Sequence, residues 1–346
     1  MTTLSCLALQ VNRKNAEQMR RYLINNNLLR KEVSISHDDT YVFFPLTSKN
    51  SLLKSYTIVK RKFQKKKQIT AAYIHSINLP EKMQTNLPRS YDIIGDILLL
   101  KLSRELLPYK EEIGEAFLQS QPHITSVYLI AAVKGEFRTR KVVHLAGDQE
   151  TETVHKEYGL HFWVDIKDTY FSPRLATERR QVTQQVQPHE VVVDLFTGVA
   201  PFSIMIAKYA QPKIVYAVDK NKKAIDYAKK NIVQNKVLDC IEPILADATM
   251  IEEILPIKAD RIIMNLPFSS FSFFPKALQI ANNSCTIHYY DILTEDAIKT
   301  RIKELRTIAH QHHFRISTIR KRKIKSYSPR EFYMGMDITV TKADVA

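Results

Sequence analysis

The sequence predicts an α/β protein in three parts: a small α+β module, a mostly β middle domain, and an open, largely parallel, doubly wound sheet. Two patterns and the chain length predict this fold class. Strand-like and helix-like segments alternate beyond residue 190, whereas short apolar runs of strand length dominate residues 91–166. The length of 346 residues suits two or three domains of roughly 100–200 residues each. We therefore expect domains at residues 1–75, 76–168 and 169–346.

The first module should combine strands with one helix. Short apolar runs at residues 4–11 and 41–46 are typical of strands, and apolar residues recur at helical spacing over residues 15–29. A basic run, KRKFQKKK, follows at residues 60–67. We expect its tail and the polar stretch near residues 80–88 to form a linker. The basic run itself fits a solvated surface or a contact with phosphate, since aromatic and apolar residues interleave with the lysines.

The middle domain begins with a strand pattern, IIGDILLLKL, and a helix at residues 105–119. Four further strand-like runs then follow at residues 124–133, 140–147, 152–158 and 160–166. Beyond them, Ser172 and Pro173 have the residue types of a helix N-cap and of the first helical position. They predict a helix that continues to about Val186.

The last part alternates between the two kinds of segment. Strand-like runs lie at residues 191–196, 213–219, 241–247, 260–267, 285–292, 314–327 and 334–342. Helices are expected at residues 202–209, 221–234 and 294–313. This order is typical of a doubly wound sheet, in which a ligand binds at the carboxyl ends of the strands.

Basic charge is concentrated at the two ends of the chain. The formal net charge is +15; residues 1–75 hold 14 basic and 4 acidic residues, and residues 301–346 hold 11 and 4. The residues between these two ends are nearly neutral. A neutral body with basic ends favours a catalytic centre flanked by surfaces for a polyanion, although a lysine-rich surface alone would give the same total.

Composition excludes several classes of protein. A hydrophobic fraction of 45% with 25% charged residues is that of a folded globular chain. No apolar run approaches the ~20 residues that span a bilayer, and no secretory signal is visible at the start. Cys6, Cys240 and Cys285 are too few and too scattered for a disulfide framework or a zinc cluster. We expect a reduced, cytoplasmic protein without a metal, and a monomer.

Acidic residues stand at the ends of three consecutive strands. Asp194 begins the segment DLFTGVAPFS, in which Gly198 permits a sharp turn and a close approach to a ligand. Asp219 follows Gly198 by 21 residues, and an acid about 20 positions on commonly binds ribose hydroxyls. Asp247 ends the third strand, where it would accept from an adenine amino group. Because Asp is depleted in strands and costly to bury, a core role explains these residues poorly.

The fourth strand ends in the segment MNLPF. Asn265 offers a donor and an acceptor, Pro267 stiffens the loop, and Phe268 supplies a flat surface for a planar base. The four strand ends resemble those of class I, Rossmann-like methyltransferases that use S-adenosylmethionine. No G-x-G-x-x-G fingerprint and no P-loop are present, so NAD and ATP have little support. The resemblance implies a cofactor site that comprises Arg179, Asp194, Phe196, Gly198, Asp219, Lys220, Asp247, Ala248, Asn265 and Pro267.

Two further segments are more specific. By itself, the pair Arg174 and Glu178 in YFSPRLATERR could be a surface ion pair, because the two residues are four apart on a helix. Together with GEFRTRKVVHLAG at residues 135–147 and the NLP motif, this segment closely resembles the archaeal and eukaryotic type of tRNA (guanine37-N1)-methyltransferase. The resemblance continues through SYDIIGDILLLKL, HKEYGLHFWVD, IHYYD and SYSPREFYMGMDITV, and it covers the N-terminal module more loosely.

The resemblance implies roles for individual residues. Glu178 would be the general base that removes the N1 proton of guanine, and Arg138 would stabilise the charge that develops at O6. Asn265 and Pro267 would position the base, and Tyr170 would support the site. This set is chemically reasonable, because guanine N1 becomes a nucleophile only as its proton leaves and charge moves to O6.

The resemblance also implies the partner. The N-terminal module would be a tRNA-binding domain that touches the outer corner of the tRNA, and the basic residues 315–330 would bind the anticodon stem. Ala200 departs from the family pattern, which has a second glycine there; its methyl group could crowd the methionine moiety. Three alternatives remain open: an enzyme that also methylates a wyosine precursor, transfer of the aminocarboxypropyl group of the cofactor to such a precursor, or a tRNA-binding protein without activity.

Overall fold

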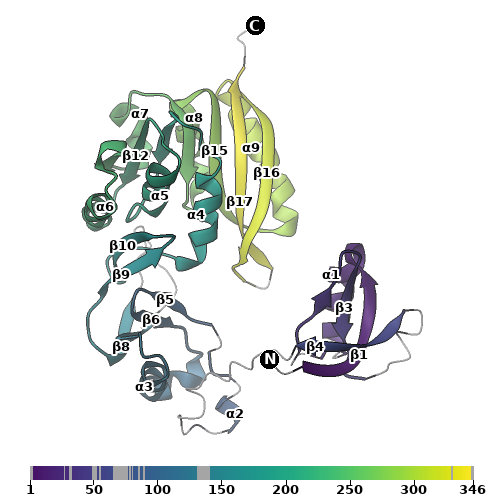
Figure 1. Ribbon diagram of the computed structural model, residues 1–346. Helices are drawn as coiled ribbons and strands as arrows, with labels where there is room; N and C mark the ends of the chain where they lie inside the picture. Colours follow the sequence, from purple (N-terminus) through teal and green to yellow (C-terminus); the bar gives the residue numbers. More distant parts are fainter. Residues whose placement is uncertain are drawn as a thin grey trace. The chain divides into compact units, whose positions relative to one another are not determined.

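The structure is a computed structural model that divides into two compact units, Met1–Asn78 and Leu79–Ala346 (Figure 1). It describes residues 3–26, 28–30, 33–48, 53, 56–64, 77, 79, 81–84, 86–88, 90–130, 141–328 and 330–343. Among these residues, no helix has both the length and the apolar character that crossing a membrane requires.

The first unit is an antiparallel sheet with a helix packed against it, as expected for a small α+β module. Its elements are β1 (Thr3–Asn12), η1 (Arg13–Asn15), α1 (Ala16–Asn25), β2 (Ser36–His37), β3 (Tyr41–Pro45) and β4 (Ile58–Gln64), with strand order β2-β3-β1-β4. Leu9, Leu23 and Phe44 are almost fully buried between helix and sheet.

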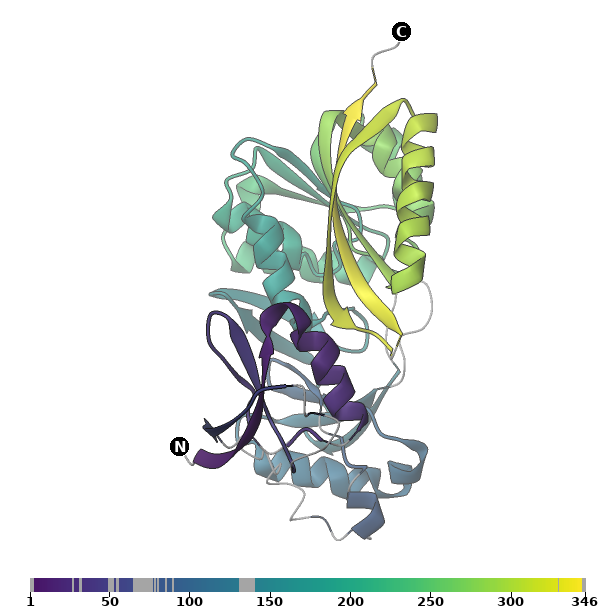
Figure 2. The same ribbon diagram turned by 90° about the vertical axis from the view of Figure 1, so that its right-hand side faces the viewer.

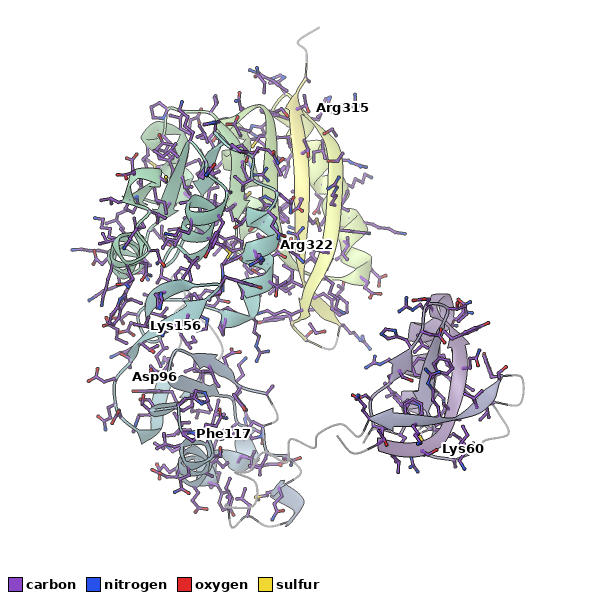
Figure 3. The ribbon with its side chains drawn as sticks, in the orientation of Figure 1. Lys60, Asp96, Phe117, Lys156, Arg315 and Arg322 are labelled. Atoms are coloured by element: carbon purple, nitrogen blue, oxygen red, sulfur yellow. The ribbon has the colours of Figure 1, made fainter. Side chains whose placement is uncertain are left out.

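Strand β4 changes the interpretation of the basic run. Residues 60–64 belong to β4, which pairs with β1, and Lys60 lies on this strand in Figure 3. Phe63 is buried, whereas Lys60 and Lys62 are exposed, as the two-residue period of a strand requires. The Arg61 guanidinium lies 3.8 Å from the ring centre of Phe43. The remainder of the run lies outside the described residues.

The second unit begins with a smaller sheet of order β5-β6-β7-β8 and a two-stranded hairpin. The elements are α2 (Glu81–Gln84), β5 (Asp92–Ile94), β6 (Ile97–Leu100), η4 (Arg104–Tyr109), α3 (Lys110–Ser120), β7 (Ser126–Ile130), β8 (Val142–Gly147), β9 (Glu152–Glu157) and β10 (Leu160–Asp165). The expected helix and the four later strands of the middle region are therefore present. Leu160 and Phe162 of β10 belong to the same buried cluster as the large sheet that follows.

The pattern IIGDILLLKL forms two strands rather than one. A turn at Gly95 and Asp96 separates β5 from β6, and the two strands pair antiparallel. Gly95 has φ +59°, and a Cβ at this position would lie 1.9 Å from Thr153 Oγ1. Glycine is therefore required both by the backbone angle and by the neighbouring strand β9. The continuous apolar run concealed this turn.

The large sheet has the order β13-β12-β11-β14-β15-β17-β16 and is open and largely parallel, as predicted (Figure 1). Its strands are β11 (Val191–Asp194), β12 (Ile214–Asp219), β13 (Ile241–Leu245), β14 (Ala259–Met264), β15 (Ala281–Thr294), β16 (Phe314–Ser326) and β17 (Glu331–Lys342). Strand β17 runs antiparallel to both of its neighbours, and the strands from β13 to β15 are parallel.

Helices cover both faces of this sheet. The helical elements are η5 (Pro173–Leu175), α4 (Ala176–Thr183), α5 (Pro201–Tyr209), α6 (Lys222–Gln234), η6 (Leu238–Cys240), η7 (Ala248–Met250), α7 (Ile251–Ile254), α8 (Ser270–Ile280) and α9 (Glu295–Gln311). Val192 of β11 packs in the cluster that contains α4, α5 and α6, and its neighbour Val193 packs with α7, α8 and α9. Figure 2 shows α9 beside the yellow hairpin of β16 and β17.

The N-terminal caps of the helices agree only in part with those expected from the sequence. Asn221 and Thr294 accept capping hydrogen bonds from Lys223 N and Ala297 N, respectively. Ser172 makes no side-chain capping bond to a described residue, and the segment after it begins as the short 3-10 turn η5. The expected helix is therefore present over α4, but its start does not depend on the serine hydroxyl.

Candidate functional site

The carboxyl ends of β11, β12, β13 and β14 border a cavity of about 370 Å³, which we call the strand-end cavity. Because these strands are adjacent and parallel, their ends meet at one edge of the sheet. Most of the residues expected at the cofactor or base site line it: Tyr170, Arg179, Phe196, Gly198, Asp219, Lys220, Asp247, Ala248 and Asn265. Among the described residues, those lining the cavity do not include Asp194 or Pro267.

Asp219 fixes the turn that follows β11. Its Oδ2 accepts from Gly198 N at 2.8 Å, and its Oδ1 accepts from Asn221 N at 2.9 Å. Gly198 has φ +57°, the left-handed region in which glycine has no steric penalty. Burial raises the pKa of Asp219, and the backbone hydrogen bonds oppose this shift. A carboxylate has about four lone-pair sites, so Asp219 can also accept from a ligand hydroxyl.

Asp247 lies on the next strand end in a more open position. Its Oδ1 accepts from Thr249 N and Thr249 Oγ1, both at 2.8 Å, and these bonds lower the pKa of Asp247. Lys220 Nζ lies 3.9 Å from Asp247 Oδ2. The cavity therefore has carboxylates on two neighbouring strand ends, of which Asp247 is clearly ionised at neutral pH.

Asp194 supports the loop rather than facing the cavity. It is 1% exposed, and its Oδ2 accepts from Thr197 Oγ1 at 3.0 Å and from Ser203 Oγ at 2.9 Å. Burial raises the pKa of Asp194 to about 7. The carboxyl group of Asp194 therefore stabilises the turn at residues 195–198 from its buried side.

Ala200, which replaces the expected second glycine, has φ +66° and is fully buried. Its methyl group belongs to the hydrophobic cluster on the α5 side of the sheet. Of the described residues, Ala200 is not one that lines the strand-end cavity. The substitution therefore places a left-handed alanine in the hydrophobic core.

A second cavity of about 370 Å³ adjoins the first, and we call it the outer cavity. The two cavities share Tyr170, Ser172 and Phe268. Charged and aromatic side chains line much of the outer cavity: Tyr91, Asp92, Lys101, Arg174, Lys325, Tyr327 and Tyr333. Phe268 and Tyr327 are 58% and 54% exposed, and their rings meet edge to face at 5.5 Å. Exposed aromatic rings beside basic groups suit the stacking of a nucleobase.

Glu178 is buried on α4 and lines neither cavity among the described residues. Its Oε1 accepts from Tyr290 Oη at 2.7 Å. The Tyr290 ring packs against Phe202 of the strand-end cavity and Tyr333 of the outer cavity, with ring centres 6.1 and 6.0 Å away. The carboxylate is therefore one aromatic layer from both cavities. Arg138 lies outside the described residues.

Arg179, the next residue along α4, contacts a different strand, β9. Its Nε donates to Glu157 Oε1 at 2.8 Å, and its Nη2 donates to the carbonyl of Ser172 at 3.2 Å. Arg179 is 1% exposed as a residue, yet it lines the strand-end cavity. It joins β9 to the segment that contains Tyr170.

Several partners of these residues were not predicted from the sequence. Tyr290, Tyr333 and Arg322 contact Glu178 or Asn265, but they come from β15, β17 and β16. Tyr290 and Tyr333 stand inside two of the segments that carry the family resemblance, IHYYD and SYSPREFY. Those segments suggested importance without a role, because the contacts join residues more than 60 positions apart.

Comparison with known proteins agrees with this geometry. A model of the TRM5/TYW2 methyltransferase domain matches residues 153–317, and a model of the tRNA methyltransferase 5 N-terminal domain matches residues 8–52. A tRNA (guanine(37)-N(1))-methyltransferase Trm5b of Pyrococcus abyssi is 36% identical over 97% of this chain and 99% of its own length. The chain belongs to the TRM5/TYW2 methyltransferase family. The resemblance seen in the sequence is thus confirmed.

Two further relatives show which activities and ligands occur among similar proteins. A tRNA(Phe) (4-demethylwyosine(37)-C(7)) aminocarboxypropyltransferase of Methanocaldococcus jannaschii is 36% identical, over 71% of this chain and 96% of its own length. A solved complex of aTrm5 and tRNALeu has 38% identity and a TM-score of 0.67, covering 96% of this chain and 99% of that one. The predicted fold class is therefore confirmed, and the family includes enzymes with different transferred groups.

Proposed function

We propose that this protein transfers the methyl group of S-adenosylmethionine to N1 of guanosine 37 in tRNA. The observation that carries the proposal is the extent of the match. The relative named as a guanine-N1 methyltransferase matches 97% of the chain, whereas the aminocarboxypropyltransferase matches 71%. The N-terminal domain models do not separate the two branches of the family, because a model named for tRNA methyltransferase 5 matches residues 8–52 and one named for TYW2 matches residues 72–151.

The strand-end cavity fits the proposed cofactor. Asp219 and Asp247 supply carboxylates for ribose hydroxyls and an adenine amino group, and Phe196 adds an apolar wall. When bound, S-adenosylmethionine supplies an electrophilic methyl group and is left as S-adenosylhomocysteine. Asp219 has a second task, because it holds the Gly198 turn in place. Asp194 does not line the cavity and supports it indirectly, by accepting a hydrogen bond from Thr197.

The chain's own residues provide the acid–base chemistry. Glu178 accepts the N1 proton of guanine, which leaves the N1 electron pair available for the methyl group. The negative charge that then moves to O6 would be stabilised by Arg138, whose role rests on the sequence resemblance. The N1 atom of guanine must come within hydrogen-bond reach of the Glu178 carboxylate, and catalytic contacts commonly tighten only when substrate binds.

The target base would enter the outer cavity. Phe268 and Tyr327 offer ring faces and edges to an unstacked guanine, and Lys101 and Lys325 lie close by for phosphates. Removing a base from its stack costs a few kcal/mol, which phosphate contacts can offset. Strand β16 carries further basic residues, of which Arg315 is labelled in Figure 3. The basic N-terminal module would bind the tRNA elsewhere, at its outer corner.

Mass spectrometry of the product nucleosides tests this function. The protein is incubated with S-adenosylmethionine and tRNA transcripts that carry guanosine 37, and we expect 1-methylguanosine together with S-adenosylhomocysteine. Methylthioadenosine as the by-product would instead identify transfer of the aminocarboxypropyl group. Absence of any modified nucleoside, with tRNA still bound, would identify a binding protein. Parallel assays on tRNA that carries 4-demethylwyosine test the wider substrate range.

A further inference from the structure

We propose that Arg322 is a positioning residue for the general base: it holds the carboxylate of Glu178 in a fixed orientation and is itself held by Asp337. This inference rests on the proposed function, because it gives Arg322 a task in the same methyl transfer. It adds a residue of β16 and a chain of buried polar groups behind it to the catalytic arrangement.

The contact between Arg322 and Glu178 uses both carboxylate oxygens. Arg322 Nε lies 2.9 Å from Oε2 and 3.1 Å from Oε1 and donates to both, and Arg322 Nη2 also donates to Oε1. Tyr290 Oη donates to Oε1 as well, at 2.7 Å. Every one of these partners donates, which is the arrangement that an ionised carboxylate requires. Two directions of approach, from Arg322 and from Tyr290, fix how the carboxylate is turned.

Arg322 is held from its other side by Asp337 of β17. Arg322 Nη1 donates to Asp337 Oδ2 at 2.7 Å, and Gln185 Nε2 donates to the same oxygen at 3.2 Å. The guanidinium is planar and rigid, so the bond to Asp337 fixes the plane from which Arg322 reaches Glu178. Arg322 therefore differs from a surface arginine that moves freely to a phosphate.

A buried histidine holds Asp337 in turn. Arg261 Nη1 lies 2.8 Å from His288 Nε2, and an arginine can only donate, so Nε2 accepts. The proton of the neutral ring must then be on His288 Nδ1, which donates to Asp337 Oδ1 at 2.7 Å. Arg261 also pairs with both oxygens of Glu190, at 2.7 and 2.9 Å. The chain of bonds is continuous from Glu178 to Glu190.

This chain connects the base to the strand that holds the target-base residue. Arg261 lies on β14, and Asn265 follows directly after the same strand. His288 and Asp337 lie on β15 and β17, the two strands next along the sheet. Glu178 on α4 is thus bonded to the sheet that positions Asn265. Placement errors of about 1 Å can cost 10²-fold in rate, so such a connection has a catalytic purpose.

A double-mutant cycle tests the inference in the full-length protein. We measure the single-turnover rate of 1-methylguanosine formation for Arg322→Gln, Glu178→Gln, the double variant and the wild type. Arg322→Gln should lower the rate by about 10- to 100-fold, the range expected when a reacting group loses its orientation. The KM for tRNA and the affinity for S-adenosylmethionine should change less than three-fold. In the Glu178→Gln background, the same substitution should slow the reaction less than two-fold, because its target is already absent.

The opposite face of the sheet offers a matched control. Tyr289 Oη donates to Asp291 Oδ2 at 2.7 Å, and Arg301 Nη1 lies 3.1 Å from the same oxygen. This face therefore has its own carboxylate between a tyrosine and an arginine, like Glu178 between Tyr290 and Arg322. Tyr289 and Tyr290 are neighbours on β15 with side chains in different clusters. Arg301→Gln breaks a pair of the same chemistry and should leave the single-turnover rate within two-fold of wild type.

Two results would overturn the inference. An equal loss of rate from Arg322→Gln in both backgrounds would mean that Arg322 acts independently of Glu178, for example on an RNA phosphate. A rise in the KM for tRNA without a change in the single-turnover rate would lead to the same conclusion. Arg322→Lys should recover part of the rate, and the thermal midpoint of each variant verifies folding. If the wild type forms no 1-methylguanosine, the proposed function fails, and this outcome is distinct from an additive cycle in an active enzyme.

Discussion

Tyr333 donates a hydrogen bond from its hydroxyl to Asn265 Oδ1 and so joins the two cavities. Asn265 lines the strand-end cavity, and Tyr333 lines the outer cavity. Asn265 follows β14, whereas Tyr333 lies on β17, the reversed strand of the sheet. Because Oδ1 accepts from Tyr333, the amide orientation is fixed and Nδ2 remains as its donating end.

Tyr333→Phe should therefore lower the rate of methyl transfer with little effect on cofactor binding. A neutral hydrogen bond contributes about 0.5–1.5 kcal/mol, so we expect a decrease in kcat of roughly 2- to 13-fold. Tyr289→Phe is the control: it removes a tyrosine hydroxyl that also donates to a side-chain oxygen but lies on the other face of the sheet, and it should leave kcat unchanged. Equal effects of the two substitutions would show that the Tyr333 hydroxyl has no special relation to Asn265.

Asp219→Asn should weaken the binding of S-adenosylmethionine. The carboxylate accepts from Gly198 N and Asn221 N and faces the strand-end cavity. Hydrogen bonds to a charged group are worth about 1.5–3 kcal/mol, which corresponds to roughly 10- to 150-fold in Kd. Isothermal titration calorimetry measures the change. Asp226→Asn, an exposed substitution on α6, is the control, and an equal loss of affinity there would contradict the assignment.

Lys325→Gln should weaken tRNA binding in a salt-dependent way. Lys325 lines the outer cavity, which is not the expected binding site of the cofactor. If it neutralises one phosphate, the slope of log(kcat/KM) for tRNA against log salt should become less steep by about 0.7–0.9. The affinity for S-adenosylmethionine serves as the internal control. An unchanged slope would mean that Lys325 does not contact the RNA backbone.

Most of the fold could be predicted from the sequence because its strands and helices have clear periods. The run VVVDLF predicts β11, and the capped segment after Asn221 predicts α6. Strand β4 was missed because its lysines suggested a surface run, although Phe63 alternates with them. The hairpin of β5 and β6 was missed because apolar residues stand on both sides of Gly95.

The site was predictable only where it follows the order of the strands. Asp219, Asp247 and Asn265 stand at successive strand ends, so the topology of the sheet brings them together. The partners of Glu178 are different, because Tyr290 and Arg322 are 112 and 144 residues away in sequence. No local pattern encodes such contacts. They follow from the pairing of β15, β17 and β16.

Gly95→Ala should destabilise the protein far more than Gly159→Ala. Both glycines have left-handed backbone angles, φ +59° and +80°, so both substitutions carry a strain of roughly 1–2 kcal/mol. A Cβ at Gly95 would also lie 1.9 Å from Thr153 Oγ1 and 2.9 Å from the carbonyl of Val154, whereas one at Gly159 meets Tyr209 Oη at 3.5 Å. We expect a lower thermal midpoint for Gly95→Ala; similar midpoints would show that the β5–β6 turn can shift away.

The pKa of Asp194 predicts how stability depends on pH. Its pKa is about 7 in the folded protein, because the carboxyl is buried, and about 3.9 in an unfolded chain. Between these values the folded state keeps a proton that the unfolded chain releases, so the free energy of unfolding falls as pH rises. Below about pH 4 and above about pH 7 both states hold the same number of protons at this site, and the contribution is constant.

The difference between wild type and Asp194→Asn isolates this contribution from the other titrating groups. A shift of about 3 pKa units corresponds to about 4 kcal/mol across the window, at 1.36 kcal/mol per unit. Asparagine does not titrate, and its oxygen can accept from Thr197 and Ser203 as Asp194 Oδ2 does. Stability relative to wild type should therefore rise for Asp194→Asn between pH 5 and pH 7 and then level off. Thermal midpoints measured at half-unit steps test this, and parallel curves for the two proteins would show that Asp194 is already ionised at pH 5.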